Sequence, residues 1–485
     1  MDIRIANARV GHRLAQQLGP AAVRKNRAAA RLRMLFVTLL GIVLWGGGTS
    51  ARASIPVAED GEGIKVGQRS TFHPGFALVS GVDSNVFYGA SEEDPQAAAF
   101  ISPTGWLGIG NRQVRDGLLM KPPERSARLA DYSLRAVMNF RQYLARQDNI
   151  RQQARISGGG ILRLAILPGR RFEIDLDEDF FRTAQPSNFD AGSEFNFNRI
   201  DHNGTLRFIG RPGGGRVGIG VGYNNQLLRF QSSDERDIAK GNRMINGTQT
   251  EVKWRFLPKS SLFFSYDFAW SFYLDCCESI GEGRNEDNYA HRIRGGFRGQ
   301  VLRKVALDAT AGWGFGYYRD DPNGPSFSSF IGHLGLDYFP TLRTNPHLSG
   351  YRQFQDSLLG NYFVDNGARL AARHQWRWRM YSTLGVGVAG RRYAGLPTQQ
   401  EDESIEGYVG RGAREFRRED VLFVLDAKIE QPVKRIWSFG LQYDLVVDSA
   451  NFVTTFVPQD GDDAGSRDIA GFTKHVIMLL AAVRI

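Results

Sequence analysis

Cysteine is almost absent from this sequence, which has only the adjacent pair Cys276 and Cys277 in 485 residues. Neighbouring cysteines bridge each other only with strain, and two ligands are too few to hold a structural metal. We therefore expect no metal site and no bound cofactor. The pair lies in a polar stretch, and we interpret it as a loop feature without chemical consequence.

Catalytic motifs are missing as well. The sequence has no G-x-S-x-G, no H-E-x-x-H and no phosphate-binding P-loop. Its histidines beyond the N-terminal region are scattered without partner spacing: His73, His202, His291, His333, His347, His374 and His475. These absences favour a protein that is not an enzyme.

Apolar runs are too short for a membrane-spanning helix, which needs about 20 residues. Residues 1–53 instead combine a basic stretch, an uncharged apolar run from Met34 to Trp45, and an A-R-A ending at Ala53. That order is typical of a secretory signal peptide with cleavage after Ala53. The residue directly after the cleavage position is Ser54 and not a cysteine, so a lipoprotein anchor is not supported.

Excess positive charge is confined to this targeting segment. The whole chain carries a formal net charge of +10, but residues 1–53 hold nine Lys or Arg and one acid, a net of +8. The remaining +2 gives no reason to expect a nucleic-acid partner. Residues 54–485 contain no linker and no helical block, so we expect a short periplasmic segment over 54–70 and then one large repetitive domain.

Period-two alternation is the dominant feature that the sequence does have. Segments 217–223, 312–317 and 437–445 place apolar or aromatic residues at every second position, with small or polar residues between them. Such alternation predicts β-strands with one apolar face. Tilted strands that cross a bilayer need about 9–11 residues, and many of the alternating segments reach that length.

The pattern predicts an all-β fold over 71–485, a single antiparallel β-barrel of the outer membrane without a second soluble domain. We expect about eighteen strands, within a range of sixteen to twenty. The expected strands are 71–82, 97–110, 131–143, 154–167, 172–182, 197–210, 216–229, 244–257, 261–274, 289–302, 305–318, 327–339, 346–355, 362–374, 377–391, 420–431, 436–450 and 471–485.

Links between the expected strands alternate in length. Most are tight after even-numbered strands and long and polar after odd-numbered ones, as periplasmic turns and extracellular loops alternate in outer-membrane barrels. Link 111–130 is an exception, since it is long on the side where turns are expected. Hydrocarbon has no water to satisfy a free strand edge, so the last strand must pair with the first.

The last expected strand carries an apolar face that runs to the chain end. Its residues are Ile477, Leu479, Ala481, Val483 and Ile485. This face resembles the C-terminal signal recognised by the barrel-assembly machinery, which usually ends in an aromatic residue, so the match is partial. The resemblance implies that machinery, together with outer-membrane lipids, as partners.

Charged residues occupy the alternate positions, which would line the lumen if the apolar face meets lipid. A basic side chain on the lipid face would cost about 2–4 kcal/mol at the midplane. Two interpretations stay open: pairs that lock neighbouring strands, or a polar conduit for hydroxyl-rich or anionic solutes. The lumen-lining candidates are Arg135, Arg141, Asp175, Asp177, Asp179, Arg207, Glu251, Lys253, Arg255, Arg292, Arg294, Arg298, Arg369 and Arg373.

A short motif follows the first expected strand: Asp83, Ser84, Asn85, Val86, Phe87 and Tyr88. A first strand that ends in a D-S-N-V-F/Y turn resembles outer-membrane β-barrels of delta-proteobacterial type. It also resembles barrel proteins encoded with exopolysaccharide biosynthesis and export systems. For that group the resemblance implies a passive conduit for polymer, working with periplasmic and inner-membrane export components.

We therefore expect an outer-membrane pore, with export of an extracellular polysaccharide as the specific hypothesis. The first alternative is a general or substrate-selective diffusion porin. The second is a plugged structural barrel at the surface that conducts nothing. An outer-membrane lipid-modifying enzyme built from a Ser, a His and an acid on barrel strands is the least favoured.

Overall fold

The computed structural model describes residues 61–89, 95–111, 129–151, 155–183, 198–230, 242–274, 287–319, 326–357, 361–394, 418–450, 454–456, 465–467 and 471–485. The expected signal peptide, Cys276, Cys277 and most of link 111–130 lie outside these residues. No helix within the described ranges is long and apolar enough to cross a membrane.

All eighteen expected strands are present within a few residues of their expected bounds. They are β2 (Ser70–Asp83), β3 (Ala98–Gly110), β4 (Ala130–Leu144), β5 (Arg155–Ile166), β6 (Phe172–Thr183), β7 (Arg199–Gly210), β8 (Val217–Phe230), β9 (Arg243–Leu257), β10 (Ser260–Tyr273), β11 (Asn288–Leu302), β12 (Val305–Tyr318), β13 (Phe327–Tyr338), β14 (Thr344–Asp356), β15 (Tyr362–Gln375), β16 (Tyr381–Ala394), β17 (Glu419–Val433), β18 (Trp437–Ala450) and β21 (Thr473–Arg484).

Five short elements were not expected from the sequence. They are β1 (Ile64–Val66), the helical turn α3 (Asp148–Arg151), the 3-10 turn η1 (Pro212–Gly215), β19 (Thr454–Phe456) and β20 (Gly465–Arg467).

The start of one expected strand, 377–391, is wrong by four residues, because β16 begins only at Tyr381. Residues 376–380 form a turn in which the Trp376 amide donates to the Met380 carbonyl oxygen at 2.8 Å. Arg379 closes this turn with a left-handed φ of 62°. Tryptophan and arginine alternate through the turn and so imitate a strand in the sequence.

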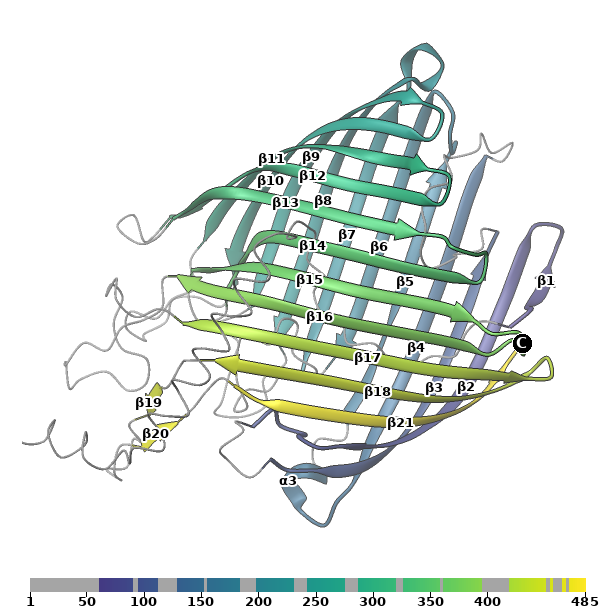
Figure 1. Ribbon diagram of the computed structural model, residues 1–485, viewed down its shortest axis with the longest axis vertical. Helices are drawn as coiled ribbons and strands as arrows, with labels where there is room; N and C mark the ends of the chain where they lie inside the picture. The colour runs from purple at the N-terminus through teal and green to yellow at the C-terminus, as the bar shows by residue number, and fades with distance from the viewer. Residues whose placement is uncertain are drawn as a thin grey trace, which may run out of the picture. The chain divides into compact units, whose positions relative to one another are not determined.

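The strands close into one antiparallel barrel (Figure 1). Each strand from β2 to β18 pairs with the next, β18 pairs with β21, and β21 pairs with β2. The β21–β2 ladder runs from Gly75 opposite Arg484 to Asp83 opposite Val476. We call the end of the barrel with tight links the turn end and the opposite end the loop end.

Apolar side chains cover the outer face of the barrel. On β8, Ile219 and Val221 are 46% and 52% exposed. The other face brings together side chains of strands that are not neighbours, as where Arg207 of β7 donates to Gln249 of β9 at 3.1 Å. Only the concave side of a closed sheet allows such contacts, so the apolar face is the outer one.

β1 completes the ladder at the turn end. β21 leaves the first residues of β2 uncovered, and there β1 pairs with Ser70–Phe72. A Cβ at Gly61 would lie 2.6 Å from the carbonyl carbon of Ile485, so this segment packs against the last residue of the chain (Figure 1). An otherwise free strand edge is thereby paired.

The wall is split between β13 and β14 toward the loop end. Their ladder joins only Gly332–Asp337 to His347–Arg352, six positions, whereas β12 and β13 pair at twelve. Beyond Arg352, β14 pairs with β15 alone. Residues 353–356 of β14 therefore keep their ladder to β15, which pairs with β16 along its whole length, but they have no ladder to β13.

The alternation of β8 yields a paired test of inside and outside. Ile219→Arg should block folding into lipid, because an arginine on the lipid face costs about 2–4 kcal/mol near the midplane. Gly218→Arg should fold, because a Cβ at Gly218 meets nothing within 4 Å on the inner side. The measurement is the heat-modifiable gel shift after refolding into vesicles, and equal yields of the two variants would contradict the assignment of faces.

Candidate functional site

The predicted wall residues alternate with exposed apolar neighbours and so lie on the inner face. Lys253, for example, follows Val252 and precedes Trp254, which are 43% and 53% exposed. The contacts of the wall residues divide them into ion pairs, arginines stacked on rings, and a group around one cavity. Arg135 of β4 lies opposite Gly108 of β3 and Ile161 of β5 in the two adjoining ladders.

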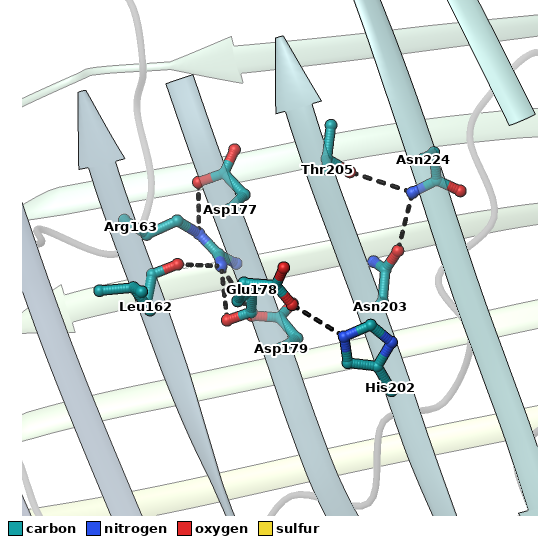
Figure 2. A network of polar contacts seen from close by, with 9 residues as sticks. All are labelled: Leu162, Arg163, Asp177, Glu178, Asp179, His202, Asn203, Thr205 and Asn224. Carbon is teal, nitrogen blue, oxygen red and sulfur yellow. Dashed lines mark hydrogen bonds and ion pairs between the residues drawn. The ribbon is translucent and has the colours of Figure 1, made fainter. Parts of the chain in front are cut away.

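The acidic strand β6 is held by one arginine of its neighbour β5. Arg163 contacts Asp177 at 3.1 Å and Asp179 at 2.7 Å (Figure 2). The next strands continue the network, where Asn224 donates to the side-chain oxygens of Asn203 and Thr205 at 2.9 and 3.0 Å. These bonds cross strand boundaries and stiffen the wall.

Arginines of β11 and β15 also pair across the wall. Arg298 of β11 contacts Asp308 of β12 at 2.9 Å. Arg294 pairs with Asp267 of β10, and Arg369 of β15 pairs with Asp426 of β17. In this part of the wall, the charged residues therefore act as pairs that hold strands together, the first of the two interpretations of the sequence.

Four predicted arginines lie over aromatic rings, where the guanidinium is attracted to the ring face. Arg298, which also pairs with Asp308, lies 4.9 Å from the Phe263 centroid. The other three are Arg141 over Phe100 at 4.4 Å, Arg292 over Phe354 at 4.4 Å and Arg373 over Tyr381 at 5.1 Å.

A cavity of about 300 Å³ opens on the inner wall of β6–β11 near the turn end. Six predicted residues meet there: Asp175, Arg207, Glu251, Lys253, Arg255 and Arg298. The wall behind them is bare at Gly218 and Gly220, which leaves room for a solute.

Four further charged residues line this cavity and were missed by sequence reasoning: Glu173, Arg211, Arg216 and Lys259. Arg211, Arg216 and Lys259 lie in tight links, where alternation does not assign a face. Arg211 pairs with Glu173 at 2.6 Å. The lining then has seven cations and three carboxylates, a formal net charge of +4, so the cavity favours anionic groups.

One carboxylate–histidine pair lies on the outer face, against expectation. Glu178 Oε2 contacts His202 Nε2 at 2.8 Å (Figure 2). Glu178 follows Leu176 and precedes Phe180 on the apolar side of β6. Away from strand ends and from the split part of β14, it is the only carboxylate that faces outward on the described strands. The alternation of β6 contained this signal.

The motif after β2 joins the first and last strands of the barrel. Asp83, fully buried at the end of β2, pairs with Lys474 of β21 at 3.0 Å. The Lys474 ammonium also donates to the Asn85 carbonyl oxygen at 2.6 Å and lies 3.9 Å from the Tyr88 ring centroid. Ser84 exchanges two hydrogen bonds with the backbone of His475.

The rest of the motif shapes the turn and buries its rings. Asn85 bonds both the amide and the carbonyl of Gly89, at 2.7 and 2.8 Å. Val86 is buried in the apolar cluster of β2, β3 and β21, and Phe87 packs against it. Burial and the nearby Asp83 carboxylate raise the pKa of Tyr88, so its hydroxyl stays protonated. Each motif residue thus has a structural contact.

The predicted assembly face lies on the outer side of β21. Leu479 is 59% and Ile477 50% exposed, and Ile485 at the chain end is 44% exposed. Recognition of this face by the assembly machinery stays a prediction.

No family model matches the chain. No curated protein matches it either. Among solved structures, the chain is similar to OpdQ of Pseudomonas aeruginosa at 7% identity, with TM-score 0.40 and coverage of 86% of this chain and 97% of that one. It is also similar to OccAB4 of Acinetobacter baumannii at 8% identity, with TM-score 0.40 and coverage of 85% and 98%. A third is OpdK of P. aeruginosa with vanillate, at 9% identity, TM-score 0.39 and coverage of 85% and 99%.

The fold assignment rests on the ladder and faces of this chain itself. A closed ring of eighteen antiparallel strands, apolar outside and charged inside, is the architecture of transmembrane barrels. The chain is an outer-membrane-type β-barrel. Its inner wall holds a cationic cavity, and its first and last strands are joined by the Asp83–Lys474 contact.

The contact between Asp83 and Lys474 should dominate closure at the loop end. Lys474→Met leaves the Asp83 carboxylate buried without its cation, which typically costs about 3–5 kcal/mol. Urea unfolding of the refolded barrel should show a loss of that order in the free energy of unfolding. The double variant Asp83→Asn/Lys474→Met should lose less than the single variant, and an unchanged midpoint for Lys474→Met would refute the role.

The outward pair permits a second stability test. His202→Leu strands the Glu178 carboxylate among apolar side chains and should destabilise the barrel. The double variant Glu178→Leu/His202→Leu should restore stability or exceed the parent by about 1 kcal/mol, since apolar replacements of secluded ion pairs are often neutral or stabilising. Urea unfolding in vesicles measures the free energy of unfolding of both variants. A double variant that is less stable than His202→Leu would contradict the prediction.

Proposed function

We propose that the protein is a substrate-selective diffusion pore of the outer membrane that passes small anionic polar solutes. The cavity near the turn end supports this most directly, because its lining carries a formal net charge of +4. Lys253 and Arg255 are among the seven cations of this lining. At eighteen strands a barrel is wide enough for an aqueous channel.

The anionic preference follows from how charge is distributed on the inner wall. Elsewhere arginines of the inner wall pair with acids or lie over aromatic rings, as with Arg163 and Asp179 at 2.7 Å and Arg373 over Tyr381 at 5.1 Å. At the cavity, cations outnumber carboxylates, so an entering carboxylate or phosphate is attracted to it. The planar guanidinium suits such oxyanions because it can donate two parallel hydrogen bonds to two of their oxygens.

Export of an extracellular polysaccharide is a separate hypothesis that the family resemblance implies. The motif that carries this resemblance, Asp83 to Tyr88, makes contacts that close the barrel. Those contacts would serve a barrel of any cargo, so the motif gives no support to a polymer. The cationic cavity of about 300 Å³ has the size of a site for a small solute, and diffusion of small solutes is therefore the proposal that the wall supports better.

Planar-bilayer recording of refolded residues 54–485 tests the pore. The expected result is steady conductance, a reversal potential that favours anions, and block by small dicarboxylates. Lys253→Glu should lower the anion-to-cation permeability ratio at least two-fold. The matched control is Arg435→Glu, the same change at a turn residue that is 82% exposed.

The alternatives give different outcomes in the same set of measurements. Cation preference in the parent, or equal shifts in Lys253→Glu and Arg435→Glu, would reject the anionic pore. Silence from a folded, heat-modifiable barrel would favour a non-conducting structural barrel. Block by oligosaccharides alone, with loss of surface polysaccharide on gene deletion, would favour polymer export.

A further inference from the structure

The split between β13 and β14 places the end of β14 inside the barrel. Leu348, on the outer face of β14, is 40% exposed, and Phe354 has the same parity. Phe354 is nonetheless only 2% exposed, because its ring lies on the inner wall. Beyond Arg352, the outer side of β14 therefore does not face lipid. It packs against the inner face of β9–β13.

The inner wall is shaped to receive the Phe354 ring. A Cβ at Gly314 would lie 2.7 Å from the ring, and a Cβ at Gly316 would lie 3.1 Å from it. Phe327 of β13 stacks on Phe354 with ring centroids 4.1 Å apart. Arg292 of β11 lies over the same ring at 4.4 Å. Two bare glycines, a stacked ring and a guanidinium thus form a seat for one side chain.

Polar contacts hold the neighbouring residues. Asp356, at the end of β14, accepts a hydrogen bond from Ser271 of β10 at 3.1 Å and lies 3.7 Å from Arg243 of β9. Arg352 takes the place of missing ladder bonds, since its guanidinium donates to the Phe330 carbonyl oxygen at 3.1 Å. These contacts are made by side chains, not by backbone.

We propose that the end of β14, residues 353–356, is a gate that narrows the mouth at the loop end of the pore. In the observed, tucked state it lies against the inner wall of β11–β13. In a second, zipped state β14 continues its ladder along β13, Phe354 returns to the lipid face, and the mouth widens. Conduction by the gate rests on the proposed pore function, but the motion does not.

The register predicts the contacts of the zipped state. Gly332 opposes Arg352 in the existing ladder, so continued antiparallel pairing would set Ser328 opposite Asp356. The zipped state gains backbone bonds along β13 but turns Arg352 and Asp356 toward lipid, where charge is costly. The tucked state keeps both groups in polar contacts and is therefore the resting state.

Pairs of engineered cysteines distinguish the two states in the full-length barrel, with Cys276 and Cys277 changed to serine throughout. Ser271→Cys/Asp356→Cys should form a disulfide in the tucked state. Ser328→Cys/Asp356→Cys should form one only in the zipped state. Leu336→Cys/Leu348→Cys is the control, because these two residues oppose each other in the ladder that both states share.

The expected result is that both test pairs cross-link in vesicles, the zipped pair more slowly than the control. Phe354→Ala should speed the zipped cross-link at least two-fold, because it empties the ring seat. Relative to the reduced protein, the tucked disulfide should lower single-channel conductance and the zipped disulfide should raise it.

Each negative outcome has its own meaning. If the Ser328→Cys/Asp356→Cys pair stays reduced while the control oxidises, the end of β14 does not move and the gate is wrong. If both pairs cross-link and conductance is equal in the two locked states, the motion does not gate. If both cross-link and neither state conducts, the proposed pore function fails while the motion stands.

Discussion

Backbone hydrogen bonding is the constraint on which the whole structure depends. Hydrocarbon offers neither donors nor acceptors, so each strand of the wall must find both neighbours within the sheet. The ladder meets this requirement only because β21 returns to β2, from Gly75 to Asp83. Two local devices finish the closure. The buried Asp83–Lys474 pair joins the strands at the loop end, and β1 covers the start of β2 at the turn end.

The same constraint separates charge from apolar surface. Every second side chain must face lipid, so ionisable residues gather on the inner wall, where two interpretations of them hold in different places. Around Arg163 and Arg298, opposite charges bind neighbouring strands. Around the cavity near the turn end, cations exceed acids, and on this excess rests the proposed preference for anionic solutes. The Glu178–His202 pair breaks this separation on the outer face.

At one place the wall does not meet this requirement with backbone bonds, because the ladder between β13 and β14 stops at Arg352. Where β14 leaves β13, side chains replace the ladder: Arg352 bonds the Phe330 carbonyl oxygen, and the Phe354 ring fills the space above Gly314 and Gly316. Side-chain contacts are exchanged more easily than a continuous ladder, because each can break without disturbing the next. The proposed gate depends on this difference, because the end of β14 would exchange its side-chain contacts for a ladder along β13.

The sequence by itself determined the class of fold, a count of about eighteen strands and the apolar face of many of them. Period-two alternation arises because successive side chains of a strand face lipid and lumen in turn, whichever strands lie beside it. It misled at Trp376–Arg379, where a turn happens to alternate. Tertiary structure alone decided that Asp83 meets Lys474, that scattered charges share one cavity, and that β14 leaves the wall at Arg352. Those outcomes depend on register and on packing between segments far apart in the chain, and no local pattern encodes either of them.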